Sequence, residues 1–599
     1  MKNSPPNPSR FHLHPLRIVA FRSSLFALIL LPSCSNPFAP LDADYDRHLA
    51  ASPERLRGID RFDASPFARP APDPAAKPDL SAKPPSRLAG LATVAITIEQ
   101  ARAAALANNL DIEVALVNPT IAAERLKAEE AKFEAVFTPN AAYSISDTPT
   151  LDTTSSNQGK GWRAGAGVSV PLRTGGRASI DFTEGYSESD NRFLTLGSSY
   201  SNEVAFSLSQ QLLRGAGRRA NTYSIRIAEF DRQIGEAATK LEVIRRLADV
   251  DRVYWVLDAL QSELNVRLKE LEAAQEDLGR AQRLVRAGSV AEIEVVRAES
   301  AAAAKLTAII AAENSVLQQQ RELKRLMNSP DLPLESGTLV ECRTAPDPVP
   351  YAFEREVLAQ AAIANRMEML QLELQLASDF SAIEFAKNQA LPSFVLDFRY
   401  GIGGLGPTLS ESARVLRRNN FESWTLGVRG EIPIGNEAAR ARVREAVLLR
   451  LQRLSTREAR IDAIAQEVLS AIDNVESSWQ QILANIQSAA LSDRLYKAER
   501  NKLGVGGGTN IDVVNALRDL ANAEVILVRA KANYQIALVD LAFATGTLLG
   551  ANKIDWSPLD GADAPGADPT PSAFPLYADP RKAATVPAEG RPKEEGMGR

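Results

Sequence analysis

The most conspicuous chemical signal in the sequence is a glycine cluster. Gly401, Gly403 and Gly406 follow the spacing G-x-G-x-x-G, which in dinucleotide-binding proteins lets a backbone approach a pyrophosphate. That chemistry also requires a βαβ unit, and a helix with an apolar face directly after the glycines. Residues 407–410 do not predict such a helix. We therefore expect residues 401–406 to form a flexible loop after a strand, with no bound cofactor.

The side chains that catalysis and metal binding use most are concentrated outside the predicted folded region. His12, His14 and His48 all precede it, and Cys34 and Cys342 are too few to form a metal cluster or a disulfide framework. We expect no catalytic residue, no metal and no cofactor, and hence no enzyme. The 69 basic and 74 acidic residues give a net charge of -5, which argues against a nucleic-acid partner.

The N-terminus has the order of a secretory signal. Three arginines precede an apolar run over residues 25–31, which is too short to span a bilayer, and Cys34 follows. A cysteine at this place resembles the lipobox of bacterial lipoproteins, although Pro32 departs from that pattern. We predict lipidation of Cys34 after removal of residues 1–33, and a signal peptide with an incidental cysteine is the alternative. Ser35 resembles the residue that directs lipoproteins to the outer membrane.

Most of the chain consists of one module written twice. Four pairs of landmarks recur in the same order, each at an equivalent change of predicted structure. The pairs are residues 107–111 with 364–368, Pro139 with Pro392, residues 212–215 with 432–435, and Gly288 with Gly506. Each half therefore contains the same series of helices and strands.

Long helices are predicted in both halves. Apolar residues recur every three or four positions from Ile461 to Ile486, and residues 216–287 contain no proline. A helix of about 70 residues would be roughly 105 Å long. A second helix returns after Gly288 and after Gly506, so each half contains a helical hairpin far longer than a globular core needs.

The predicted strands alternate between apolar and polar or small residues, which suits a membrane barrel with a wet lumen. Four principal strands lie near residues 143–146, 204–209, 394–400 and 424–432. Four strands cannot close a barrel, so copies of the chain must combine theirs, and three copies would supply twelve. Residues 162–171 and 178–186 form an additional hairpin, which either extends the sheet above the membrane or enlarges the barrel.

With its duplicated modules, the strand exit at residues 432–435 and the two hairpin turns, the chain resembles the TolC-like outer membrane efflux protein family over residues 96–550. The resemblance implies a mainly α fold with β strands, in which a homotrimer forms an outer-membrane β-barrel continued by a periplasmic α-helical barrel. It also implies that the hairpin ends contact a periplasmic adaptor (membrane fusion protein) served by an inner-membrane transporter. These adaptor-contact residues would be Ala287, Gly288, Ser289, Val505, Gly506 and Gly507.

The expected organisation is therefore a signal peptide (1–33), an N-terminal segment with a proline-rich linker (34–95), two efflux-protein repeats (96–330 and 353–550) joined by a linker (331–352), and a disordered tail (551–599). The expected function is the exit duct of a tripartite efflux or type I secretion system, attached to outer-membrane lipid through Cys34. The alternative is a periplasmic coiled-coil adaptor or scaffold lipoprotein without a pore. Two hairpins, each bracketed by amphipathic strands, favour the duct.

Overall fold

The computed structural model describes residues 86–147, 158–189, 194–288, 291–505 and 507–556, which all belong to one compact unit of the chain. Cys34, Ser289 and Gly506 lie outside the described residues, as do the predicted signal peptide and nearly all of the predicted tail. No helix in the described ranges is long and apolar enough to cross a membrane.

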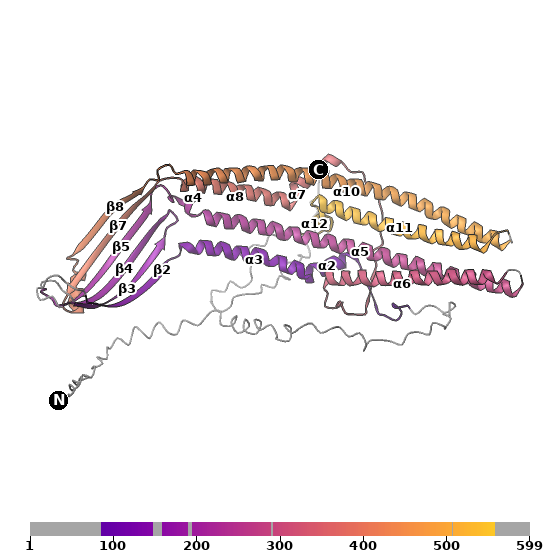
Figure 1. The fold of residues 1–599 in the computed structure, drawn as a ribbon, viewed down its shortest axis with the longest axis horizontal. Helices are drawn as coiled ribbons and strands as arrows, with labels where there is room; N and C mark the ends of the chain where they lie inside the picture. Colours follow the sequence, from indigo (N-terminus) through magenta and orange to yellow (C-terminus); the bar gives the residue numbers. More distant parts are fainter. Residues whose placement is uncertain (1–85, 148–157, 190–193, 289–290, 506, 557–599) are drawn as a thin grey trace, which may run out of the picture. The chain divides into compact units, whose positions relative to one another are not determined.

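Six antiparallel strands form the main sheet (Figure 1), in the order β2-β3-β4-β5-β7-β8. They are β2 (Val136–Asp147), β3 (Gln158–Pro171), β4 (Gly176–Ser189), β5 (Ser198–Gln211), β7 (Ser393–Gly406) and β8 (Glu422–Glu431). The additional hairpin is β3–β4, and it lies inside the sheet between β2 and β5. The hairpin therefore widens the sheet, which contains the four principal strands and both strands of the additional hairpin.

The glycine cluster is not a loop. Residues 401–406 are the last part of β7 and pair with β5, so the prediction of a flexible loop was wrong. The expectation that no amphipathic helix follows was wrong too, because α9 (Leu409–Arg417) begins three residues after the strand. Strand glycines are often found where another segment approaches closely, and α9 is that segment here.

The helices of each half begin with a broken pair and continue into a long hairpin (Figure 1). In the first half they are α2 (Ile98–Asn108), α3 (Leu110–Glu130), η2 (Ala131–Phe133), α4 (Arg218–Asn221), α5 (Tyr223–Arg286) and α6 (Ile293–Met327). In the second half they are α7 (Arg355–Asn365), α8 (Met367–Gln389), α9, α10 (Glu437–Gly504), α11 (Asn510–Ala544) and α12 (Leu548–Ala551). With 64 and 68 residues, α5 and α10 are about 96 and 102 Å long, close to the predicted length.

The first repeated landmark is the break between the two short helices. Asn109 caps α3, because its Oδ1 accepts hydrogen bonds from the backbone N–H groups of Asp111 (2.9 Å) and Ile112 (3.1 Å). At the equivalent place before α8, Arg366 forms ion pairs with Glu368 (2.6 Å) and Glu467. The break is thus present in both halves, although an asparagine cap stabilises it in the first half and ion pairs stabilise it in the second.

The sheet is joined to the helices at one end only, through the start of β2, the end of β5, the start of β7 and the end of β8. The strand register places the end of β5 beside the start of β7 (Gln211 with Val395) and the start of β7 beside the end of β8 (Ser393 with Glu431). At the two exits from strand to helix, Gly215 and Gly435 have φ angles of 73° and 85°, which favour glycine. The loop between β7 and β8, which includes α9, lies at the opposite end.

The helices form a wall in which each packs against its neighbours. Next to the sheet the packing order is α3-α5-α8-α10, and farther away it is α6-α5-α11-α10. The core beneath α5 also includes β1 (Thr93–Ile96) and β6 (Leu339–Cys342), which pair in parallel. The buried Tyr254 hydroxyl links them, since it donates to the Ile96 carbonyl and accepts from the Thr344 N–H, both at 3.0 Å. Burial raises the pKa of the Cys342 thiol well above its ordinary value, which fits a structural cysteine.

Candidate channel wall and hairpin ends

One face of the main sheet is apolar apart from one row that contains Glu184 and Asn202. A single register row crosses all six strands and presents only large apolar or aromatic side chains. The row consists of Phe137, Val168, Ile180, Phe206, Tyr400 and Trp424. Of these, Phe137, Ile180 and Trp424 are 61%, 58% and 68% exposed. An apolar face with this much exposure is what a membrane-embedded sheet presents to lipid.

An aromatic row lies on the same face, closer to the loop end of the sheet. Tyr143, Trp162, Tyr186 and Tyr200 occupy matched positions on the first four strands, and the fifth strand has Gly406 there. The rings of Tyr186 and Tyr200 lie 5.0 Å apart. Aromatic residues collect where membrane meets water, so this row indicates the level of the headgroups.

The other face of the sheet is polar. Arg399 on β7 forms an ion pair with Glu203 on β5 at 2.7 Å, and Arg429 on β8 pairs with Asp397 on β7 at 2.8 Å. Ser209 on β5 also donates to Asp397 at 2.8 Å. Charged groups in this arrangement would be costly against lipid but are stable in water. This face can therefore line an aqueous pore.

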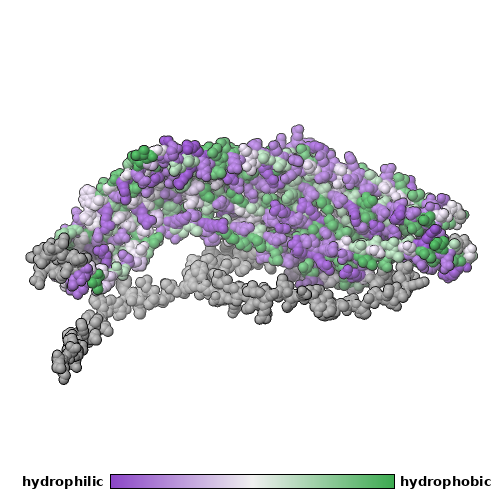
Figure 2. Space-filling model, in the orientation of Figure 1, coloured by the Kyte–Doolittle hydropathy of each residue, from purple (hydrophilic) through white to green (hydrophobic). Residues whose placement is uncertain are grey.

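The two margins of the helical wall carry exposed apolar residues. On α3, Leu110, Val114, Val117 and Ile121 repeat every three or four positions and are all exposed. On α10, Leu448, Leu449 and Leu451 are exposed as well. Elsewhere on the face shown in Figure 2, hydrophilic residues are interspersed with isolated hydrophobic ones along the helices.

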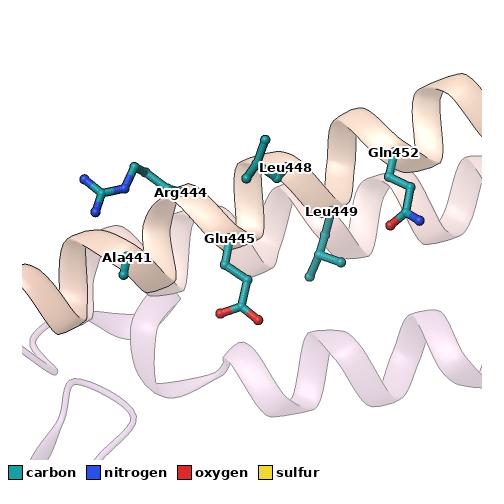
Figure 3. Close-up of a pocket in the computed structure, with 6 residues that line it drawn as sticks. All are labelled: Ala441, Arg444, Glu445, Leu448, Leu449 and Gln452. Atoms are coloured by element: carbon teal, nitrogen blue, oxygen red, sulfur yellow. The ribbon is translucent and has the colours of Figure 1, made fainter.

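A shallow hollow on α10 is lined by Ala441, Arg444, Glu445, Leu448, Leu449 and Gln452. Figure 3 shows that these side chains radiate from a single helix, with Glu445 and Leu449 on one side and Arg444 and Leu448 on the other. A ligand site needs polar groups that converge, so this hollow is a helix surface and not a binding pocket. Within the described ranges, no group of three or more His, Cys, Asp or Glu side chains could hold a metal.

The hairpin ends are short, exposed turns. Ala287 caps α5, and Gly288 follows with a φ of 70° and donates its N–H to the Val285 carbonyl at 2.9 Å. Val505 is 85% exposed at the end of α10, and the Gly507 N–H donates to the Lys502 carbonyl at 3.0 Å. The positive φ expected of a glycine at such a turn is therefore present at Gly288.

Thr509 and Asp512 form a capping box at the start of α11, so the second turn passes directly into a well-terminated helix. A side chain at the Gly288 Cβ position would meet no atom within 4 Å. The end of the first hairpin therefore has open space in front of its backbone, as a docking surface requires.

A charged layer, which the sequence did not single out, lies near the hairpin ends. Asp277 on α5 is buried 3.5 Å from Arg280, and burial raises the pKa of its carboxyl. Glu276 pairs with Arg500 on α10 at 3.4 Å and so connects the two hairpins. Nothing in the local sequence marks these residues, because charged residues are frequent all along both helices.

A sheet with one apolar and one polar face, joined at one end to long helices, defines an outer-membrane channel with a periplasmic extension. The comparisons agree: the sequence pattern of the outer membrane efflux protein family matches residues 179–329 and 358–547, which is more than half of the chain. The chain belongs to this family. Its members are transport proteins and not a class of enzymes.

Among curated proteins, the outer membrane protein TolC of Vibrio cholerae is 23% identical over 328 residues, which is 53% of this chain and 71% of TolC. Among solved structures, the CmeC outer membrane channel of Campylobacter jejuni matches with a TM-score of 0.57 at 16% identity, over 75% of this chain and 86% of CmeC. The open state of the MtrE channel of Neisseria gonorrhoeae matches with a TM-score of 0.52 at 17% identity, over 75% of this chain and 89% of MtrE.

At these identities the solved structures establish the TolC-like fold, and the family match establishes the function. The chain is an outer-membrane efflux channel protein that extends into the periplasm, and the duct is favoured over the adaptor. The predicted TolC-like fold class, the function as an outer-membrane efflux channel and the location are thereby confirmed.

Proposed function

We propose that three copies of the chain form the exit duct of a tripartite efflux or type I secretion system. The observation that carries this proposal is that both margins of the described part of the chain lack a partner. In the sheet, β2 and β8 each pair on one side only. In the wall, α3 and α6 form one margin and α10 the other. Unpaired strand edges invite pairing with another chain, and a head-to-tail contact of this kind closes into a ring.

The sheet and the helices support the same contact. The margin formed by β2 continues into α3, and the margin formed by β8 continues into α10. A neighbour that pairs its β8 with β2 therefore brings its α10 to the exposed stripe on α3. Burying Val114 and its apolar neighbours in this way removes apolar surface from water.

The strand number supports the second role considered for the additional hairpin, which was to enlarge the barrel. Six strands from each of three copies would give eighteen in place of twelve. Barrel diameter grows roughly linearly with strand number, so the barrel would be about one and a half times as wide.

Trimer formation can be tested at the stripe on α3. Val114→Glu places a charge in the proposed contact, and Val114 is 67% exposed, so the fold of the single chain should survive. We expect loss of the trimer with an unchanged circular dichroism spectrum, measured by light scattering in detergent. Thr120→Glu is the matched control, because it adds the same charge to an exposed position on α3 outside the stripe. A Val114→Glu variant that remains trimeric would remove this stripe from the interface.

We further propose that the hairpin ends at Ala287, Gly288, Ser289, Val505, Gly506 and Gly507 bind a periplasmic adaptor served by an inner-membrane transporter. The exposed turns and the open space in front of Gly288 support this contact. Gly506→Trp should leave the trimer intact and abolish export in cells. Ser488→Trp, on an exposed position of α10 away from the turn, should export normally. Normal export by Gly506→Trp would exclude Gly506 from the contact.

The N-terminal segment completes the proposal. Lipidation of Cys34 after removal of residues 1–33 would attach the proline-rich linker (34–95) to the membrane, ahead of the repeats at 96–330 and 353–550. The intact mass of the mature protein checks this: it should exceed that of residues 34–599 by the mass of the attached lipid. A mature chain that is unmodified at Cys34 would favour the incidental cysteine.

A further inference from the structure

The helix α9, which lies between β7 and β8, has a buried side and a charged side. Thr408 caps its start, and its Oγ accepts from the Glu411 N–H at 3.4 Å. Ser412 is fully buried, whereas Arg414, Arg417 and the capping residue Arg418 are exposed. Because successive residues of a helix are about 100° apart, the three arginines lie on the side opposite Ser412.

The buried side of α9 is seated on β5 and β7. The Ser412 hydroxyl donates to the Gly404 carbonyl at 3.0 Å and to the Asn202 side-chain oxygen. A Cβ atom on Gly404 or on Gly406 would overlap the backbone of Ser412, so both positions require glycine. A Cβ on the preceding residue, Gly403, would meet nothing within 4 Å. The helix is thus fitted to one face of the strand.

That face is the apolar one. Gly404 and Gly406 alternate with Gly403 and share their side of β7 with Tyr400, while Asn202 shares its side of β5 with Phe206. Gly406 is in register with Tyr200, the last member of the aromatic row. At the level where the first four strands carry aromatic rings, the fifth therefore carries α9. Its arginines point away from the sheet.

The arginines have no acidic partner in the described part of the chain. None of the three forms an ion pair there, and the Arg417 side chain donates to the Ala413 carbonyl of its own helix at 3.3 Å. Three guanidinium groups on one helix, at the headgroup level, repel one another unless an anion binds between them. Guanidinium groups bind phosphate through two parallel hydrogen bonds, which suits a phosphorylated headgroup.

We propose that α9 is a binding site for phosphorylated lipids of the outer leaflet, with Arg414, Arg417 and Arg418 as the phosphate ligands. The sheet sets the helix at the headgroup level, and the loop end of the sheet is the end remote from the periplasmic helices. The site is complete within one chain, so it does not depend on trimer formation. It fixes the height of the sheet in the membrane at the point where β7 lacks an aromatic residue.

The test uses the full-length protein in detergent, titrated with fluorescent lipid A and with the same lipid after its phosphates have been removed. An arginine near an anionic lipid surface contributes roughly fivefold in affinity. Replacement of all three (R414Q, R417Q and R418Q) should therefore weaken binding of lipid A at least tenfold and leave binding of the dephosphorylated lipid unchanged. The matched control is R297Q with R494Q and R518Q, which removes three exposed arginines from the helical hairpins and should bind like the wild type.

A second pair of variants distinguishes the effect of the position of α9 on the sheet from the effect of its charge alone. Gly404→Leu should unseat α9 and weaken lipid A binding about as much as the arginine replacements, with all three arginines still present. Gly403→Leu adds the same side chain on the opposite face and should have no effect. Elution volume and circular dichroism report whether each variant is folded. If Gly404→Leu does not fold, the arginine replacements still decide the question.

Four results of the lipid titrations would overturn the proposal. They are wild-type affinity of the triple arginine variant, an equal loss in the control triple variant, equal binding of the dephosphorylated lipid, and wild-type affinity of a folded Gly404→Leu variant. Inorganic phosphate is the probe for a soluble anion. If phosphate displaces half of the bound lipid A at a concentration equal to the lipid's own Kd, the site binds soluble anions. That result would also overturn the lipid assignment. Loss of trimer in Val114→Glu does not affect this test, so failure of the two proposals can be distinguished.

Discussion

The two long helices α5 and α10 arise from the same repeated module but are buried to very different extents. Twenty of the 64 residues of α5 are buried, against six of the 68 residues of α10. The reason is position: α5 packs between neighbours on both sides, whereas α10 forms the margin of the wall. Similar sequences therefore contribute differently to the stability of one chain, and the contacts that α10 lacks are those that another copy would supply.

The buried charges follow the same division. On α5, Asp251 pairs with Arg102 of α2 at 2.6 Å, and Glu263 pairs with Arg529 of α11 at 2.7 Å. The six buried residues of α10 are all apolar. A buried charge needs a partner from a neighbouring element, and of the two long helices only α5 has neighbours on both sides to provide one. The central helix is consequently the one whose alteration should damage the single chain.

The largest effect is expected for Leu257→Ala on α5. Leu257 is fully buried, and truncation of a buried leucine costs about 2–5 kcal/mol of unfolding free energy. The measurement is chemical denaturation followed by circular dichroism. It should be made in the Val114→Glu background, so that trimer dissociation does not contribute. Leu257→Met keeps most of the volume and should cost less than about 1.5 kcal/mol. A loss below 1 kcal/mol for Leu257→Ala would show that the core around α5 repacks.

The next effect is a pH dependence of the unfolding free energy that Asp258 on α5 should produce. Burial raises the pKa of the Asp258 carboxyl from 3.8 to about 6. Tyr254 and Cys342 lie close by but are not a cause of this shift. Between about pH 4 and 6 the folded chain therefore holds a proton that the unfolded chain has lost. Stability from this group is highest at and below about pH 4, falls as the pH rises to about 6, and is constant above.

The comparison of wild type with Asp258→Asn isolates this effect from the other acidic residues. Because Asp258 is only partly buried, we expect the variant to gain about 1–2 kcal/mol relative to wild type between pH 4 and pH 7. Asp462→Asn, at an exposed position on α10, is the control. For this variant the difference in unfolding free energy from wild type should not change between pH 4 and pH 7. Equal slopes for both variants would mean that Asp258 is solvated in the folded chain.

Much of this fold could be predicted because its signals are local and repeated. Gly215, Gly288 and Gly435 all have the positive φ of a turn that ends or begins an element. The alternation in residues 394–400 and 424–432 predicted β7 and β8 and their two faces. Such patterns depend on neighbours in the sequence, which are visible without a structure.

The features that the sequence did not predict depend on contacts between distant residues. The position of β3–β4 inside the sheet is a pairing order, which alternation within each strand cannot reveal. The helix α9 has only nine residues, and its seat on Gly404 is made by Ser412 and Asn202, which are 210 positions apart. Short helices are only marginally stable without tertiary contacts. Residues 401–406 are therefore interpreted as a loop from the sequence alone, because their contact with α9 is not visible there.

The smallest effect on the single chain is expected for Leu451→Ala on α10, the counterpart of Leu257→Ala. Leu451 is 53% exposed, so truncation in the Val114→Glu background should cost less than about 0.5 kcal/mol of unfolding free energy. In the otherwise wild-type chain the same substitution should weaken the trimer, because Leu451 would be buried against a neighbour's α3. Light scattering over a dilution series measures that dissociation. If Leu451→Ala destabilised the single chain as much as Leu257→Ala, α10 would be a core helix. If it left both the chain and the trimer unchanged, the contact between copies would not include this part of α10.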